Sequence, residues 1–344
     1  MLDTEKYRIA VIGAGPAGRA AALSAATLGV SVDWYDKQDR AGGKLNEYHQ
    51  LFPHRVKPEN LLSGFRESEL PAGIKKHFGI AVNRIETEQA QVILLSDNKV
   101  VGGADAVIVA TGFDFFDARL KEEFGYGMYK QVITSADLEQ ILKTNPSALK
   151  KNGADPASIA FVHCVGSRDQ QIGIGYCSRL CCITGIKQAI EVKELYPSAS
   201  VVNFYIDIRA FGTGYEELYR EAQEKYRIRF IRGRVSEASE NQQYNIVLKA
   251  EDTLMARPLK LTVDWLVLLV GMVPSCTQVE LDNKKGVDGE TGFYDLADPL
   301  TGSRISGQEG VFSAGACNGP MSIPEAIASG RSAAMEAFNY IHSR

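Results

Sequence analysis

A short apolar strand that runs directly into a glycine-rich turn constrains this chain more than any other feature. Residues 9–12 are apolar, Gly13-Ala-Gly15-Pro-Ala-Gly18 follows at once, and an alanine-rich stretch comes next. A second apolar strand, residues 30–35, then delivers Asp36. In such an arrangement the glycines let the backbone approach a pyrophosphate at a helix N-terminus, and the acidic residue binds an adenosine ribose. The sequence therefore predicts a Rossmann-like α/β domain that binds a dinucleotide.

Further segments favour FAD over NAD as that dinucleotide. Arg40-Ala-Gly42-Gly43-Lys44-Leu45 resembles the second glycine pair of FAD-binding flavoproteins with two dinucleotide domains, and residues 107–112 resemble their ATG strand. Gly315-Ala316 stands where such proteins end a strand in Gly-Asp, so the usual carboxylate contact to the ribityl chain is missing. A following helix, with Pro324 expected at its first position, would direct its positive end toward the flavin. The predicted FAD-binding residues are Gly13, Ala14, Gly15, Pro16, Ala17, Gly18, Asp36, Lys37, Gly42, Gly43, Lys44, Leu45, Ala110, Thr111, Gly112, Gly315, Ala316, Ile323 and Pro324.

The order of expected elements predicts a discontinuous arrangement of domains. Residues 1–115 and 271–344 are expected to form the FAD domain, and residues 116–156 a polar connector with a helix near residues 135–143. Residues 157–270 again alternate strand and helix, which predicts an inserted dinucleotide-like domain. The fold class is thus α/β, a two-dinucleotide-binding-domain flavoprotein whose second domain is degenerate because it lacks the glycine turn.

Four cysteines replace the expected nicotinamide loop in that inserted segment. Cys164, Cys177, Cys181 and Cys182 are spaced C-x12-C-x3-C-C, at the end of one strand and the start of the next helix. One tight loop and a nearby strand end are what the four thiolates of a [4Fe-4S] cluster require. The vicinal pair needs an irregular turn, because neighbouring side chains on a regular helix point about 100° apart. Buried apolar cysteines, or a redox disulfide within the Cys177 to Cys182 loop, are the alternatives.

Composition narrows the class of protein. The chain has 344 residues and a formal net charge of −4 without a long basic run, so no nucleic-acid partner is expected. Its longest apolar stretch, residues 265–273, is far shorter than the ~20 residues of a membrane span. Six cysteines without a secretory signal favour metal binding or redox chemistry in a reducing compartment, so the expected location is the cytoplasm. Cys276 and Cys317 are expected to be structural.

Several motifs together closely resemble the HdrA family of heterodisulfide reductases. They are Phe161-Val-His-Cys-Val-Gly-Ser-Arg-Asp169, Tyr176-Cys-Ser-Arg-Leu-Cys-Cys182, Tyr205-Ile-Asp-Ile-Arg-Ala-Phe-Gly212 and Ala314-Gly-Ala-Cys-Asn-Gly-Pro320. The resemblance implies that the four cysteines bind a [4Fe-4S] cluster close to FAD, that the protein is a homodimer, and that it has HdrB-like and HdrC-like partners. Because ferredoxin-type cysteine motifs are absent from the sequence, the chain looks most like the HdrA-like subunit of the heterodisulfide-reductase-like complex of sulfur-oxidising bacteria.

The predicted function is therefore electron transfer by an FAD and [4Fe-4S] oxidoreductase subunit, in cytoplasmic sulfur oxidation. Lys187, five positions after Cys182, is a candidate for tuning the flavin potential, against the alternative of a solvated surface lysine. One rival is an NAD(P)H-dependent disulfide reductase, which would need a second glycine motif and a C-x-x-C or C-x4-C pair. The others are the flavin subunit of a related quinone-interacting complex and a scaffold with vestigial cofactors.

Overall fold

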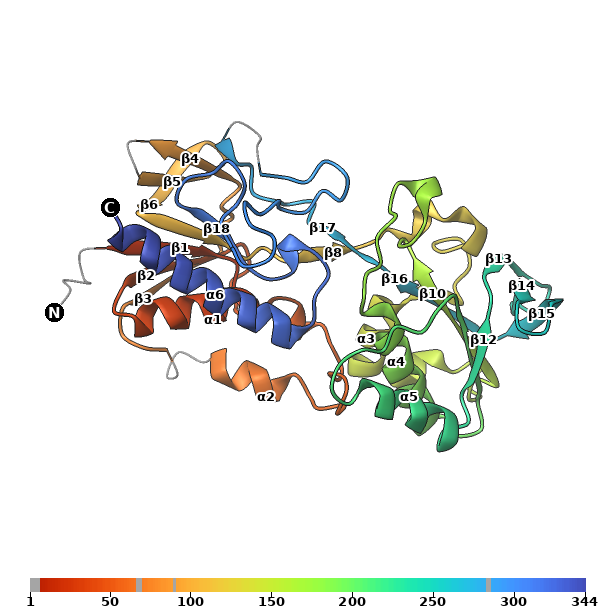
Figure 1. The fold of residues 1–344 in the computed structure, drawn as a ribbon. Helices are drawn as coiled ribbons and strands as arrows, with labels where there is room; N and C mark the ends of the chain where they lie inside the picture. Colours follow the sequence, from red (N-terminus) through yellow and green to blue (C-terminus); the bar gives the residue numbers. More distant parts are fainter. Residues whose placement is uncertain (1–6, 66–69, 89–90, 283–285) are drawn as a thin grey trace. The chain divides into compact units, whose positions relative to one another are not determined.

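A computed structural model describes residues 7–65, 70–88, 91–282 and 286–344. The chain forms two compact units, which are considered separately below (Figure 1). Unit 1 comprises Met1–Asn46, Glu59–Asp114 and Val273–Arg344, and unit 2 comprises Glu47–Pro58 and Phe115–Met272. The chain passes between units within β8 (Phe113–Phe115) and β17 (Met272–Pro274). Each unit contains a five-stranded parallel sheet in βαβ order, as the predicted two-dinucleotide-domain fold requires.

Unit 1 is a layered α/β domain with its sheet in the order β18-β7-β1-β2-β3. The central strands are buried on both faces, which is why they read as continuous apolar runs rather than as alternating ones. An antiparallel sheet, β4-β5-β6, adjoins this core and includes the meander expected near residues 80–95. The elements are β1 (Arg8–Ile12), α1 (Pro16–Thr27), β2 (Ser31–Asp36), α2 (Glu59–Leu62), β3 (Ile74–Phe78), β4 (Arg84–Glu88), β5 (Gln91–Ser96), β6 (Lys99–Ala104), β7 (Ala106–Val109), β18 (Val311–Ser313) and α6 (Ile323–His342).

Helices α1 and α6 pack closely because their facing residues are small. A Cβ atom at Gly330 of α6 would lie 2.2 Å from the carbonyl oxygen of Ala17, so only glycine permits this approach. The buried residues of both helices are mostly alanines, among them Ala21 of α1 and Ala333 of α6. The alanine-rich composition of both segments therefore determines how the two helices pack over the sheet, as Figure 1 shows.

Unit 2 repeats the βαβ plan with its sheet in the order β12-β11-β10-β16-β9. A smaller antiparallel sheet, β13-β14-β15, follows β12 in the chain. The elements are β9 (Val132–Thr134), α3 (Ser135–Thr144), β10 (Ser158–Val165), α4 (Cys181–Leu195), β11 (Ser200–Tyr205), α5 (Tyr215–Glu224), β12 (Arg229–Arg232), β13 (Val235–Glu240), β14 (Ile246–Asp252), β15 (Arg257–Val263) and β16 (Trp265–Val270).

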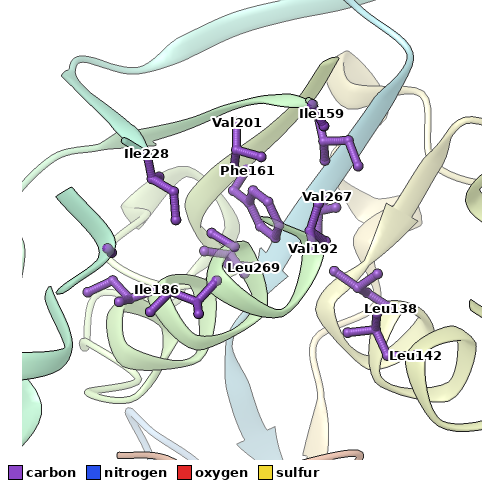
Figure 2. Packing of buried hydrophobic residues seen from close by; sticks show 14 of the residues in the cluster. Leu138, Leu142, Ile159, Phe161, Ile186, Val192, Val201, Ile228, Val267 and Leu269 are labelled. Carbon is purple, nitrogen blue, oxygen red and sulfur yellow. The ribbon is translucent and has the colours of Figure 1, made fainter. Parts of the chain in front are cut away.

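The core of unit 2 lies between the sheet and helices α3 and α4 (Figure 2). Phe161 of β10 and Leu269 of β16 meet Ile186 of α4, and all three side chains are fully buried. Leu138 and Leu142 of α3 extend the same cluster. Burial of such side chains stabilises the fold by about 1.5–3 kcal/mol each, so this cluster fixes the position of α4 and of the cysteines at its start.

The predicted polar connector, residues 116–156, is instead an integral part of unit 2. Strand β9 pairs with β16, and α3 packs against the sheet through Leu138. Glu47–Pro58, expected to belong to the FAD domain, is also part of this unit. We call this segment the strap. The connector prediction fails because the polar composition reflects exposed positions only, whereas the buried face of α3 is apolar. No helix among the described residues is long and apolar enough to cross a membrane.

Candidate functional site

The glycine turn after β1 is built by close backbone packing. A Cβ atom at Gly18 would lie 1.8 Å from the carbonyl oxygen of Gly13, and one at Gly13 would lie 2.2 Å from that of Ala110. Gly13 also has a φ of 113°, which L side chains rarely adopt. These two glycines are therefore required by the fold itself, because they let α1 start directly against β1 and β7.

Gly15 differs, because a Cβ atom there would meet nothing within 4 Å. Gly15 is the N-cap of α1 and no side chain caps this helix, so its first N–H groups face a space that protein does not fill. Gly112 borders equally open space, and the buried Thr111 hydroxyl has no hydrogen-bond partner among the described residues. An anionic ligand at the helix N-terminus would satisfy these groups, so the residues present fit the pyrophosphate of FAD.

The second glycine pair lies against this turn. The Gly42 N–H donates to the carbonyl of Ala14 at 2.8 Å, and a Cβ atom at Gly43 would lie 3.1 Å from the Cα atom of Gly15. Gly43–Asn46 forms a short 3-10 helix in which Leu45 is buried, and Lys44 lies over the ring of Phe113 at 5.1 Å. The structure thus brings together the glycine motifs that the sequence predicts to contact one dinucleotide.

Asp36 ends β2 beside the same turn. Its carboxylate accepts hydrogen bonds from the Ala14 N–H at 2.5 Å and from the Gln38 N–H at 2.7 Å. Burial raises the pKa of this carboxyl. A carboxylate has about four acceptor sites, so Asp36 retains capacity for a ribose hydroxyl. The Lys37 ammonium bonds the hydroxyl of Thr277 at 2.9 Å.

The C-terminal part of the predicted FAD site is also in unit 1. Gly315 has a φ of 81°, its N–H donates to the Ser329 hydroxyl at 3.1 Å, and Ala316 follows it. Helix α6 begins at Ile323, one residue before the expected Pro324, because the Ser322 side chain caps it and forms a capping box with Glu325. Cys317 is buried, and burial raises the pKa of its thiol to about 12, as befits a structural cysteine.

Three of the four clustered cysteines come together in unit 2. Cys164 ends β10 with a φ of 61°, and Cys181 and Cys182 begin α4. The Cys164 and Cys181 side chains are hydrogen-bonded to each other, as are those of Cys181 and Cys182. The hydrogen bond from Cys181 lowers the pKa of Cys182, and the partner role raises that of Cys181. This trio occupies the place where a nicotinamide cofactor would meet a glycine turn.

Cys177, the fourth thiol, is held by its own loop. Its sulfur accepts the Arg179 N–H at 3.3 Å, and no hydrogen bond to the trio is present among the described residues. In that part of the chain no three His, Cys, Asp or Glu side chains are arranged to hold a metal ion. The irregular turn expected before the vicinal pair is also missing, since α4 is regular from Cys181. The side-chain arrangement therefore does not form a cluster site, and the predicted [4Fe-4S] ligation stays a prediction.

The chain nevertheless returns Cys177 toward the end of β10. The Arg168 N–H donates to the carbonyl of Tyr176 at 2.9 Å, and Asp169 and Ile174 exchange two further backbone hydrogen bonds. These bonds close the loop between the first two cysteines, so a spacing of twelve residues in sequence becomes a short separation in space.

Lys187 is buried rather than solvated, with 2% of its side chain exposed. Its ammonium contacts the Glu139 carboxylate, the carbonyl of Gln50 at 2.9 Å and Glu191 at 3.5 Å. The alternative of a surface lysine is therefore wrong, while the tuning role for the flavin stays a prediction. Sequence reasoning missed Glu139 and Glu191, although Lys187 and Glu191 are four positions apart on a helix, a spacing typical of ion pairs.

Comparison with families of known proteins supports the assignment of the fold. A family model described as pyridine nucleotide-disulphide oxidoreductase matches residues 7–330. Thioredoxin reductase from Lactococcus lactis has a TM-score of 0.70 at 18% sequence identity and covers 98% of this chain and 100% of its own. The enzyme from T. acidophilum has a TM-score of 0.65 at 21% identity, with 97% and 98% covered. The predicted two-dinucleotide-domain fold is confirmed.

Sequence relatives confirm the homology to the HdrA family. The HdrA-type polypeptide of the H(2):CoB-CoM heterodisulfide,ferredoxin reductase of Methanothermobacter marburgensis is 42% identical over 237 residues, which is 67% of this chain and 36% of that protein. Its counterpart in the ferredoxin/F(420)H(2)-dependent CoB-CoM heterodisulfide reductase of Methanosarcina acetivorans is 36% identical over 244 residues, 69% and 31% of the two chains. The chain thus spans about a third of the length of these relatives. The sulfur-oxidising subtype stays a prediction.

Proposed function

Because the chain belongs to the pyridine nucleotide-disulphide oxidoreductase family, and is an FAD-dependent oxidoreductase, we propose that it is an electron-transfer subunit of a heterodisulfide-reductase-type complex. Unit 1 would hold FAD, and Cys164, Cys177, Cys181 and Cys182 in unit 2 would hold a [4Fe-4S] cluster. The observation that carries the proposal is the trio of mutually bonded thiols at the point where a second glycine turn would bind NAD(P)H.

In unit 1, open space at Gly15 and Gly112 and the unpaired hydroxyl of Thr111 support FAD binding. The uncapped N-terminus of α1 would bind the pyrophosphate, and Asp36 the ribose. Bound FAD supplies two-electron chemistry and an iron–sulfur cluster supplies one-electron transfer. The protein supplies position and electrostatics.

In unit 2, the thiols need deprotonation and one side-chain rearrangement to act as ligands. The low pKa of Cys182 and the proximity of Cys164 and Cys181 already favour thiolates at the start of α4, whose dipole stabilises negative charge. Cys177 would have to exchange its hydrogen bond from the Arg179 N–H for a bond to iron. Rotation about the side-chain bonds of one loop residue is a small change compared with the strength of metal–thiolate ligation.

The relatives suggest the wider assembly. We propose HdrB-like and HdrC-like partners and a homodimeric arrangement, by analogy with the names and sequences of the heterodisulfide reductases. A role in cytoplasmic sulfur oxidation is the finer proposal, with a quinone-interacting complex as its alternative. Co-purification of partner proteins with tagged protein from its native host would distinguish the two, because the captured partners would carry sulfur-transfer or quinone-reducing chemistry.

A disulfide reductase is the second candidate function, because three bonded thiols are also the arrangement of a redox disulfide. It is less well supported. The second unit has Cys164-Val-Gly-Ser167 where a pyrophosphate-binding glycine motif would be needed, and no second such motif follows β10.

Single replacements of Cys164, Cys177, Cys181 and Cys182 by Ala test the proposed function. After anaerobic purification, the unchanged protein is expected to contain about four irons per chain, as one cubane requires. Each of the four variants should lose the iron and the electron paramagnetic signal while FAD stays bound, because the FAD residues all lie in unit 1.

Cys276→Ala is the matched control, since Cys276 is exposed and belongs to unit 1. It should retain iron in full. Iron-free protein that forms a disulfide within the trio, and is reduced by NAD(P)H, would refute the cluster and favour the disulfide reductase. A full cluster in Cys182→Ala would show that only one member of the vicinal pair is a ligand.

A further inference from the structure

Arg168 carries a buried polar group without a partner. Its Nη2 atom donates to Asp207 Oδ2 at 2.9 Å, and its side chain is 21% exposed. Its Nη1 atom is buried and has no hydrogen-bond partner among the residues that the structure describes. A buried donor is almost always satisfied in a native protein, so this guanidinium calls for an acceptor that the side chains here do not supply.

The position of Arg168 indicates what that acceptor is. The loop closure by the Tyr176 carbonyl holds Arg168 between the end of β10 and Cys177. Its positive charge acts on the thiols of both Cys164 and Cys177. The hydroxyl of the neighbouring Ser167 is also buried and has no partner in the described part of the chain. Two unpaired donors beside two thiols fit an anionic sulfur centre.

We propose that Arg168 is a positioning and tuning residue for the iron–sulfur cluster, with its Nη1–H donating to a cluster or thiolate sulfur and its charge favouring the reduced state. This inference rests on the proposed function. Net charge and hydrogen bonds to sulfur are two of the determinants of cluster potentials. A permanent positive charge is stabilised when a nearby centre gains an electron, so its presence raises the midpoint potential.

Asp207 opposes this effect in a predictable way. Its carboxylate pairs with Arg168 and lies 3.9 Å from Arg232, so it partly neutralises the charge that Arg168 presents. The guanidinium fork fixes the orientation of Arg168, since Nη2 is bound to Asp207 and Nη1 is thereby turned elsewhere. Removing Asp207 and removing Arg168 should therefore shift the potential in opposite directions.

The test compares cluster midpoint potentials in the full-length protein, measured by redox titration with electron paramagnetic detection. Arg168→Gln is expected to lower the midpoint potential enough to change the reduced-to-oxidised ratio at least tenfold, which is about 59 mV for a one-electron couple. Arg168→Lys should recover most of this shift because it retains the charge. Asp207→Asn should raise the potential.

Arg229→Gln is the matched control. Arg229 lies on β12 of the same unit, at the opposite strand end from the cysteines, and bonds the Ser200 hydroxyl at 3.0 Å. It should leave the potential unchanged. A change below twofold in Arg168→Gln with full iron content would overturn the inference and leave the proposed function standing. If Arg168→Gln loses iron, Arg168→Lys and Asp207→Asn decide by the sign of their shifts. Absence of a cluster from the unchanged protein would refute the proposed function itself.

Discussion

Replacement of Lys187 by Met should destabilise unit 2 locally and strongly. The ammonium group lies in a fully buried polar network, where the Glu139 carboxylate also accepts hydrogen bonds from His49 N–H and Gln188 Nε2, each at 2.8 Å. Methionine retains most of the volume of the side chain but removes the charge. Glu139 would then be a buried carboxylate without a cation, and the carbonyl of Gln50 would lose its donor.

The expected cost follows from burial. Removing one partner of a buried ion pair costs about 3–5 kcal/mol, because the remaining charge is left uncompensated in a medium of low dielectric. Glu191, only 2% exposed, adds no further charge where burial keeps its carboxyl neutral. The two hydrogen bonds that Glu139 retains reduce the cost without removing it, so the lower half of this range is expected.

Native-state hydrogen exchange measured by mass spectrometry provides the assay. Peptides from α3 and α4 report on unit 2, and peptides from α1 and α6 report on unit 1 within the same sample. Lys187→Met should lower the opening free energy of α3 and α4 and leave α1 and α6 unchanged. Lys225→Met is a matched control, since its pair with Glu221 is exposed and should contribute nothing measurable.

Two results would refute this reasoning. One is a change of less than about 1 kcal/mol in α3 and α4, which would mean that water reaches Glu139. The other is additivity in the double variant Lys187→Met with Glu139→Gln, which should instead recover part of the loss because both charges are then gone.

Three further outcomes are expected. Gly15→Val should fold but lose FAD, seen as loss of the flavin spectrum, because its side chain enters open space needed by the pyrophosphate, whereas Gly18→Val should fail to fold. NADH and NADPH should bleach the flavin of the isolated protein slowly or not at all in stopped-flow measurements, because unit 2 lacks the glycine turn; bleaching at catalytic rates would contradict this. Burial raises the pKa of Glu191 from 4.5 to about 8, so stability present below pH 4.5 is lost as the pH rises toward 8, by about 1.4 kcal/mol per pH unit. Glu191→Gln should flatten that slope in unfolding midpoints measured from pH 5 to 8.

Local patterns in the sequence were sufficient for much of unit 1. The glycine turn, the helix that follows it and Asp36 lie within thirty residues, and their chemistry is determined by backbone geometry that a motif encodes directly. The same holds for β10 and α4, whose expected ranges agree with the observed ones to within a few residues.

The polar interior of unit 2 could not be predicted in the same way. Lys187 and Glu139 are 48 positions apart, and the strap is still more distant in sequence. No periodicity connects such residues, because their pairing results from tertiary packing. The thiols are an intermediate case: spacing brought attention to all four, but the hydrogen bond from Arg179 to Cys177 is a detail of loop geometry.

The strap also determines the order in which the two units can be completed during synthesis. Unit 2 has all its residues once position 272 has emerged, since Glu47–Pro58 is made early and waits for Glu139 and Lys187. Unit 1 at that moment still lacks β18, which pairs with β7, and α6, which packs on α1. Although domains generally fold from the N-terminus onward, here the inserted unit closes first, and the cofactor-binding sheet that begins the chain is the last to be finished.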